Sequence, residues 1–182
     1  MQCLQQGEAA ALEVLYHRYS RRLLAYLLRM LGNDRETAQD TLQDIFIKVY
    51  QQPELFCTSQ RFSSWIFTVA HHRCISEYRR RNTRRHTQIE SDMDIFPATN
   101  HEQDTTLDSP VDRKQFRHDL HRELDKIDER RRSIFLLRHQ EQFSIREIGH
   151  MLDCPEGTVK SSLFYITKKL AKALQHFHSF VL

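Results

Sequence analysis

Glycine and proline are scarce in this chain of 182 residues, with four of each. Proteins on average contain roughly 7% glycine and 5% proline. A fold of many short strands needs turn formers at its hairpins, so this shortage argues against an all-β sandwich or barrel. The four cysteines lie far apart and include no C-x-x-C pair. We therefore expect neither a disulfide framework nor a cysteine-rich zinc site.

Long apolar runs are missing as well. No stretch approaches the roughly 18 apolar residues that a membrane helix needs, so we expect no membrane insertion. The first residues, MQCLQQGEAAALEV, combine neither a basic start nor a long apolar segment. This argues against a signal peptide.

No pattern typical of an enzyme or of a metal site stands out. The sequence offers no nucleophile–base pair, glycine-rich phosphate loop or pair of catalytic carboxylates. His71, His72 and Cys74 lie close together, but neighbouring side chains on a helix diverge by about 100° and cannot share one ion. No distant ligand completes a site. We expect no enzyme activity, no cofactor and no bound metal.

The net charge of +3 hides an uneven distribution of charge. Residues 73–86 hold six arginines and one acid, whereas residues 87–112 hold seven acids and no lysine or arginine. The acidic stretch has few large apolar residues to bury, so we interpret 87–112 as a linker. The chain then divides into an N-terminal half, 1–86, and a C-terminal half, 113–182.

Apolar residues at helical spacing predict three helices in the N-terminal half, with stripes over residues 12–30, 38–49 and 62–75. Gly32 offers the left-handed conformation in which helices commonly stop. Asn33, with Glu36 three residues later, predicts a loose capping box at the start of the second helix. Short connections between these helices favour a compact bundle.

Four further stripes predict helices in the C-terminal half. Ser144 and Glu147 form a capping box at the start of the third of these helices, and Pro155 stands at the first position of the fourth. Gly149 is the small residue where the two helices must approach closely. A short helix, a tight turn and a second helix predict a helix-turn-helix. The expected fold class is all-α, with two small helical domains joined by an acidic linker.

The helix-turn-helix is the strongest functional signal in the sequence. Such a unit places its second helix in the DNA major groove, with N-terminal side chains toward the base edges. Here those side chains are Glu156, Thr158, Lys160, Ser161 and Ser162, and Lys168, Lys169 and Lys172 follow where they could meet phosphates. An ordinary helical hairpin with a solvated face is the alternative. The coincidence of capping box, small residue, turn and lysines favours DNA binding.

The arginine cluster is less specific. On a helix, Arg73, Arg80 and Arg84 share one face, where guanidinium groups could follow a phosphate backbone. A solvated face, or binding to RNA or to an acidic protein, remains open on this evidence.

Two sets of residues resemble motifs of a known family, the extracytoplasmic-function (ECF) sigma factors. Their region two is similar to Asp40-Thr-Leu-Gln43-Asp44-Ile-Phe46, Phe62-x-x-Trp65-Ile-x-x-Val69-Ala70 and the arginine run. Their region four is similar to Ser144-x-x-Glu147-Ile148-Gly149 and Pro155-Glu-Gly157-Thr158-Val159-Lys160-Ser161-x-Leu163. The resemblance covers both halves in the family's order.

The resemblance implies a cytoplasmic alternative sigma factor that binds core RNA polymerase and directs promoter recognition. Region two would be 1–86 and region four 113–182, with an anti-sigma factor as a further partner. The resemblance assigns polymerase binding to Asp40, Gln43 and Asp44. It assigns the −10 element to Arg73, Arg79, Arg80, Arg81, Arg84 and Arg85. It assigns the −35 element to Ser144, Glu156, Thr158, Lys160, Ser161, Ser162, Lys168 and Lys169.

Some residues depart from the family pattern, and two other classes of protein stay open. Asp153 stands where glycine is common, although Asp can adopt the left-handed conformation that this turn needs. Ser162 replaces a frequent arginine. The first alternative is a two-domain helix-turn-helix regulator that acts without polymerase. The second is a sigma mimic that sequesters a regulator.

Overall fold

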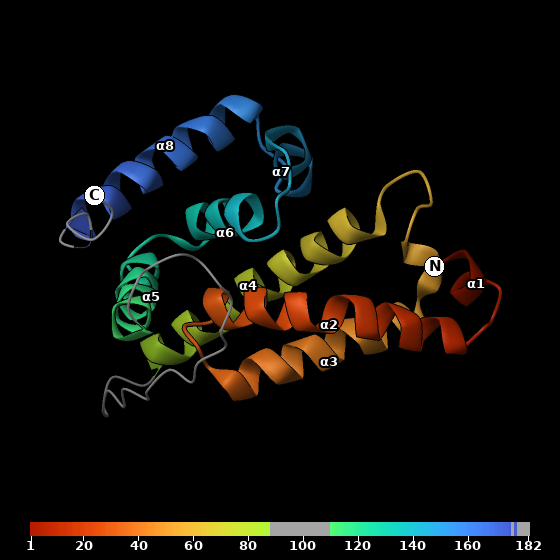
Figure 1. Ribbon diagram of the computed structural model, residues 1–182. Helices are drawn as coiled ribbons and strands as arrows, with labels where there is room; N and C mark the ends of the chain where they lie inside the picture. Colours follow the sequence, from red (N-terminus) through yellow and green to blue (C-terminus); the bar gives the residue numbers. More distant parts are fainter. Residues whose placement is uncertain (88–109, 176, 178–182) are drawn as a thin grey trace.

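Every regular element in the described part of the chain is a helix. The structure, a computed structural model, describes residues 1–87, 110–175 and 177, with side chains over 1–81, 115–175 and 177. The elements are α1 (Gln2–Gln5), α2 (Ala10–Met30), α3 (Arg35–Gln51), the 3-10 turn η1 (Pro53–Leu55), α4 (Phe62–Thr87), α5 (Pro110–Asp125), α6 (Glu129–His139), α7 (Ile145–Met151) and α8 (Glu156–Ala173) (Figure 1). The expected all-α fold class is confirmed. Most of the expected linker, residues 88–109, lies outside the described residues.

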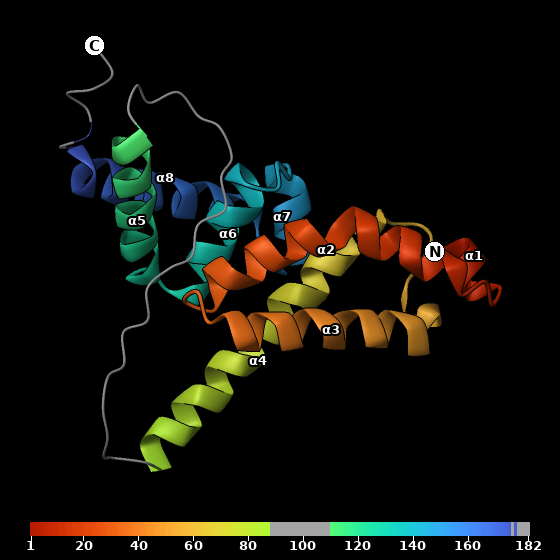
Figure 2. The ribbon, with the colours of Figure 1, turned by 60° about the horizontal axis from the view of Figure 1, so that its bottom comes forward.

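Helices α2, α3 and α4 are the three helices predicted for the N-terminal half. α2 and α3 run antiparallel, and α4 crosses them (Figures 1 and 2). Their apolar stripes meet in the core, where the fully buried side chains include Leu23, Leu27, Ile45, Ile66 and Phe67. The short elements α1 and η1 are too brief to leave a periodic signal and were not predicted. Beyond this core, the C-terminal part of α4 projects away from the body of the molecule (Figure 2).

The connection between α2 and α3 corrects the predicted cap by one residue. Gly32 takes the expected left-handed conformation, with φ of 68°, and Asn33 follows it with φ of 61°. The cap of α3 is therefore Asp34, whose Oδ1 accepts from the backbone N–H of Thr37 at 3.0 Å. The prediction at Asn33 was wrong because asparagine tolerates a left-handed backbone and served the turn.

The helix-turn-helix forms as predicted in the C-terminal half. Ser144 Oγ accepts from the Glu147 N–H at 3.2 Å, and Glu147 Oε2 accepts from the Ser144 N–H at 2.9 Å, which completes the capping box. Asp153 adopts the left-handed conformation that its position required, with φ of 47°. Pro155 is the residue before the first helical position of α8. A one-residue difference of this kind is common at helix ends.

The two halves pack against each other through polar contacts made by buried side chains. The Tyr26 hydroxyl on α2 and the Ser133 hydroxyl on α6 are 2.8 Å apart. Arg132, also on α6 and 5% exposed, donates to the Met30 carbonyl at 3.1 Å and to the Tyr78 hydroxyl at 2.8 Å. These contacts describe docked halves. They do not test whether each half folds alone, so the domain division stays a prediction.

His71, on α4, is another buried polar residue. Its side chain is 7% exposed, and its Nδ1 has no hydrogen-bond partner among the described residues. Burial, together with the positive charges of His72 and Arg130, lowers the pKa of His71 to about 4. The neutral imidazole is therefore the form that the fold accommodates.

This burial predicts a pH-dependent stability. The pKa of His71 is lower in the folded than in the unfolded chain. The contribution of neutral His71 to the unfolding free energy is therefore complete above pH 6.5 and is lost as the pH falls toward 4. We expect His71 to account for about 2 kcal/mol of lost unfolding free energy between pH 7.5 and pH 5. Urea unfolding of His71→Leu at both pH values should show a correspondingly smaller difference. An unchanged difference would contradict the assignment.

At Gly149 the fold leaves no room for a side chain. A Cβ at Gly149 would lie 2.9 Å from the Cys154 carbonyl oxygen in the turn, whereas a Cβ at Gly157 would meet nothing within 4 Å. Both residues are helical, so alanine is favoured intrinsically at each by about 1 kcal/mol. Only the clash distinguishes them.

We therefore predict that Gly149→Ala destabilises the protein by about 1–3 kcal/mol, because the turn must shift away from α7. Gly157→Ala is the matched control and should be neutral or slightly stabilising. Urea midpoints of the two variants measure the difference. Equal stabilities would show that the helix-turn-helix does not depend on this close approach.

Candidate functional site

A polar patch lies on the outer side of α3. Asp40, Gln43 and Asp44 are all exposed, while Leu42 and Ile45 beside them in the sequence are buried in the core. The structure therefore brings the three predicted residues together on one accessible surface. We call these three residues the α3 polar patch.

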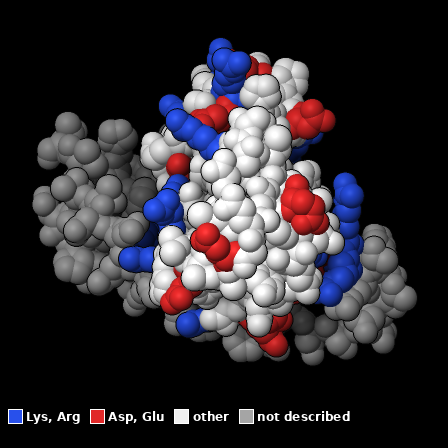
Figure 3. Space-filling view, turned by 90° about the vertical axis from the view of Figure 1, so that its right-hand side faces the viewer, with Lys and Arg blue, Asp and Glu red and all other residues white. Residues whose placement is uncertain are grey.

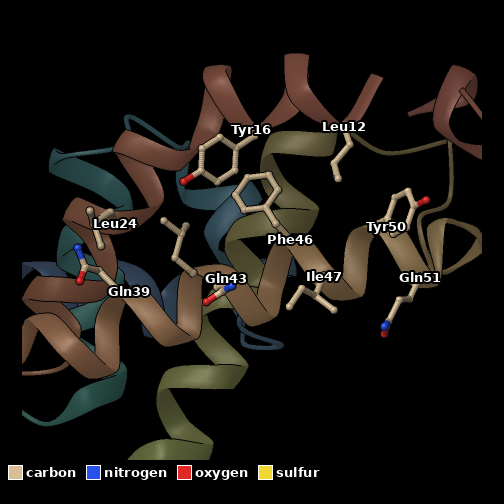
Figure 4. Close-up of a pocket in the computed structure, with 10 residues that line it drawn as sticks. Leu12, Tyr16, Leu24, Gln39, Gln43, Phe46, Ile47, Tyr50 and Gln51 are labelled. Atoms are coloured by element: carbon tan, nitrogen blue, oxygen red, sulfur yellow. The ribbon is translucent and has the colours of Figure 1, made fainter. Parts of the chain in front are cut away.

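An apolar groove between α2 and α3 adjoins this patch. It encloses about 790 Å³ and is lined by Leu12, Tyr16, Leu24, Gln39, Leu42, Gln43, Phe46, Ile47, Tyr50 and Gln51 (Figure 4). The Tyr16 and Phe46 rings meet edge to face, with centroids 4.9 Å apart. Ile47 and Tyr50 are 44% and 53% exposed, which is unusual for large apolar side chains. Gln43 belongs both to the groove and to the polar patch.

The groove was not predicted, although its signal was present. Ile47 and Tyr50 follow Gln43 by four and seven residues, which places them on the same face of α3. Nearby, the end of the molecule at which α1 lies shows a broad surface without Lys or Arg, which lie at its margins, and with a few Asp and Glu side chains on it (Figure 3). The N-terminal half thus presents a surface suited to a macromolecular partner rather than to a small substrate.

The described arginines of the cluster on α4 differ in exposure. Arg73, Arg79 and Arg80 are exposed, and Arg80 also pairs with Glu77 at 2.8 Å. Arg81 is half-buried, and its Nη2 donates to Asp34 Oδ2 at 2.6 Å while its Nε donates to Glu77 at 3.2 Å. Arg81 therefore ties α4 to the start of α3. The side chains of Arg84 and Arg85 lie outside the described residues.

Helix α8 presents most of the predicted DNA-facing residues to solvent. Those that are exposed are Glu156, Thr158, Lys160, Ser161 and Lys168. Ser162 is only 7% exposed and lies on the inner side of the helix, so we leave it out of the DNA-facing set. The Ser144 hydroxyl is already engaged in the capping box, and Lys169 Nζ donates to the Lys126 carbonyl at 3.3 Å.

Two aromatic residues on the same face of α8 were missed in the sequence. Phe164 is 72% exposed and Tyr165 is 46% exposed. The Arg131 guanidinium lies 4.7 Å from the centre of the Tyr165 ring, so Tyr165 has a partner within the fold. Phe164 follows Lys160 by one helical turn. An apolar residue at that spacing on a polar face was the signal that could have identified it.

The structure shows neither a metal centre nor a membrane span within the residues it describes. In these residues, no three side chains of His, Cys, Asp or Glu are grouped as metal ligands. No helix of the described ranges has the length and hydropathy needed to cross a bilayer. What the accessible surfaces offer is binding: a polar patch with an apolar groove, a row of arginines, and the exposed face of a helix-turn-helix.

Two family models match the chain, one in each half. The Sigma-70 region 2 model matches residues 15–84, and the Sigma-70 region 4 model matches residues 117–170. The RNA polymerase sigma-H factor of Pseudomonas aeruginosa is 28% identical over 178 residues, which cover 94% of this chain and 90% of that protein. The ECF RNA polymerase sigma-E factor of Haemophilus influenzae is 25% identical over 178 residues, covering 94% and 92%.

Solved structures show the same fold. The sigma factor RpoE of Bartonella quintana, in complex with the anti-sigma factor NepR, superimposes with a TM-score of 0.66 at 18% identity, covering 96% of this chain and 98% of that chain. CnrH, in complex with the cytosolic domain of CnrY, gives a TM-score of 0.68 at 18% identity, covering 96% and 94%. At this identity the likeness concerns the arrangement of the helices.

Proposed function

The chain belongs to the extracytoplasmic-function sigma factors, and we propose that its surfaces divide the work of that class among core polymerase, the −10 element and the −35 element. As an alternative sigma factor, it binds core RNA polymerase and directs promoter recognition and transcription initiation. Its role is then recognition without enzymatic chemistry, in the cytoplasm where polymerase acts. The observation that carries the proposal is the exposed recognition face of α8, in a chain whose two halves match region 2 and region 4 in that order.

The α3 polar patch is the proposed polymerase contact. Its three side chains are exposed without contributing to the core, so their presence is not required by the fold. The adjoining groove supplies the apolar surface that a stable protein interface needs at its centre, and Gln43 joins the two. A regulator that acts on DNA alone would have no use for such a surface. This favours the sigma factor over the alternative that works without polymerase.

The first turns of α8 are the proposed reader of the −35 element. Lys160 is exposed near the N-terminus of the helix, where helix-turn-helix proteins contact base edges. Phe164, one turn later, offers an apolar surface of the kind that contacts the methyl group of thymine. Lys168 and Lys172 lie farther along and are proposed to contact phosphates, which position a protein without reading sequence.

The exposed arginines of α4 are the proposed contacts to the −10 element. Arg73, Arg79 and Arg80 line the accessible side of the helix, and Arg84 and Arg85 extend the row along the sequence. Arg81 is proposed to position α4 through its bonds to Asp34 and Glu77 rather than to bind DNA itself. We further propose an anti-sigma partner, because a sigma factor of similar fold was solved in complex with one.

Run-off transcription tests the function directly. The full chain is added to core polymerase on templates that carry candidate promoters, and a transcript of defined length is expected only when the chain is present. A chain that binds promoter DNA but never yields a transcript would favour the regulator that acts without polymerase. A chain that binds neither polymerase nor promoter DNA would favour the second alternative, a sigma mimic that sequesters a regulator.

We predict that replacing Asp40, Gln43 and Asp44 together by alanine weakens polymerase binding. Truncation of an interface hot spot costs at least about 2 kcal/mol, which corresponds to roughly 30-fold in affinity. The unfolding free energy should change by no more than about 0.5 kcal/mol per position, because all three side chains are exposed. The control replaces exposed Arg18 and Arg21 on α2. Wild-type affinity in the triple variant would refute the contact assignment.

We predict that Lys160 and Lys168 contribute to DNA binding in different ways. Lys160→Ala should lose about 1–3 kcal/mol of discrimination between a −35 duplex and a scrambled duplex, since its side chain is placed to reach a base edge. Lys168→Ala should weaken binding to both duplexes equally and reduce the salt slope by about one. The measurement is the affinity of the full chain for both duplexes across a salt series.

The alternative is that every lysine on α8 contacts phosphate, since most protein–DNA hydrogen bonds do. In that case Lys160→Ala would lose equal affinity for the two duplexes. That result would remove Lys160 from the residues that read sequence.

A further inference from the structure

The first turn of α6 carries three consecutive arginines that make different contacts. Arg130 Nη2 donates to the carbonyls of Leu152 and Asp153, at 3.1 Å and 3.3 Å, in the turn of the helix-turn-helix. Arg132 is buried and donates to groups of the N-terminal half. Arg131, between them, keeps 47% of its side chain exposed. The fold thus uses two of these arginines internally and leaves the third accessible.

The guanidinium of Arg131 reaches the outer face of α8. It lies over the Tyr165 ring, with Cζ 4.7 Å from the ring centre. Within the described residues it makes one hydrogen bond, from Nη1 to Asp128 Oδ2 at 3.2 Å. A cation–π contact uses no hydrogen-bond donor, so further N–H groups of the guanidinium can still meet an anion. Exposed ion pairs and exposed cation–π contacts stabilise a fold only slightly, so stability does not account for this position.

Tyr165 lies on the side of the exposed face of α8 that adjoins α6. The side chains that α8 buries lie on one face of the helix and include Val159, Ile166 and Leu170. At about 100° per residue, Lys168 lies almost opposite to this buried face, and Tyr165 lies about 60° to one side of Lys168. The contact with Arg131 shows that this is the side of α6. Arg131 therefore extends the exposed face of α8 beyond the helix itself.

The position beside α8 suits a contact to the DNA backbone. The major groove is about 12 Å wide, and a helix with its side chains is about 10–12 Å in diameter, so a recognition helix fills the groove. The base edges are then covered by α8, and a guanidinium supplied from α6 reaches the phosphates that border the groove. Arginine suits this partner because its planar fork binds a phosphate through two N–H groups.

We propose that Arg131 is a further DNA contact of this chain, which binds a phosphate at the border of the −35 element, and that Tyr165 positions it. The contact rests on the proposed function, because it requires α8 to lie in the major groove. Arg131 belongs to α6, outside the helix-turn-helix of α7 and α8, so the DNA-binding surface is wider than that motif. The Asp128 carboxylate is itself 48% exposed, so its pair with Arg131 lies at the surface, where a phosphate can replace it.

The affinity of the full chain for duplex DNA across a salt series tests the contact. Arg131→Ala should lose affinity for a −35 duplex and for a scrambled duplex alike, because a phosphate contact carries no sequence information. Each phosphate contact adds about 0.9 to the salt slope, so the advantage of the wild type over Arg131→Ala should shrink about threefold between about 50 and about 200 mM salt.

Arg18→Ala is the matched control, because it removes the same charge from an exposed position on α2 and should keep the wild-type slope. Circular dichroism checks that every variant keeps its helices. A wild-type slope in Arg131→Ala would overturn the contact.

Tyr165→Ala tests the positioning. This substitution changes no charge, so a ring that contacts DNA itself, or one that only supports the fold, would leave the salt slope unchanged. A ring that positions Arg131 should lower the slope as Arg131→Ala does, and Tyr165→Phe, which keeps the ring, should restore it. Lost affinity with a wild-type slope in Tyr165→Ala would overturn the positioning role.

Neutral methylphosphonate groups, placed one at a time in the −35 duplex, locate the phosphate. At one position the wild type and Lys160→Ala should lose affinity, whereas Arg131→Ala, which has already lost the contact, should lose none. A duplex without such a position would overturn the assignment to a single phosphate.

Two further comparisons separate this contact from the proposed function. If Lys160→Ala loses discrimination while Arg131→Ala keeps the wild-type slope, α8 reads DNA as proposed and the Arg131 contact fails. If the slope follows Arg131 but the wild type yields no run-off transcript with core polymerase, the contact stands and the sigma function fails. A wild-type chain that binds no duplex would overturn both.

Discussion

The arrangement of the two halves of this protein depends on the hydrogen bonds of the buried Arg132 guanidinium. Besides the Met30 carbonyl and the Tyr78 hydroxyl, it donates to the carbonyls of Asp125 and Ile127 at 2.8 Å and 3.0 Å. Arginine stays charged even when buried, so its position is tolerated only where several acceptors converge. The Met30 carbonyl belongs to the last turn of α2, where carbonyls lack partners within the helix. The Arg132 side chain therefore donates hydrogen bonds both to carbonyl oxygens of the turn before α6 and to a carbonyl oxygen at the end of α2.

The docking of the two halves leaves the proposed binding surfaces of the chain accessible. The surfaces that are proposed to bind partners, the α3 polar patch and the outer face of α8, stay exposed when the halves are docked. Between the halves lie apolar side chains together with buried polar contacts, among them the Arg22–Glu141 pair and the hydrogen bonds of Arg132. Docking thus leaves each proposed contact surface exposed.

Local features of the fold could be predicted from the sequence, and long-range ones could not. The 3.6-residue periodicity gave the long helices, and the capping box at Ser144 and the close approach at Gly149 follow from rules that act over a few residues. Asp34 was missed by one residue because two left-handed residues precede the helix instead of one. Ser162 was misplaced because residue type suggested DNA, whereas its angle around α8 turns it inward. The docking of the halves joins residues more than 100 positions apart, and no local pattern encodes it.

The account is tested most directly by one distance, measured by fluorescence energy transfer between the two halves in the free chain and in its complex with core polymerase and promoter DNA. Labels are placed at exposed Gln60 and Arg146, after Cys3, Cys57 and Cys154 are replaced by serine. These two positions neighbour Arg61 and Glu147, whose side chains lie 3.4 Å apart across the two halves. We predict efficient transfer in the free chain, because the halves are docked, and a large loss of transfer in the complex, because each half then occupies its own promoter element. The same transfer efficiency in both states would contradict the account.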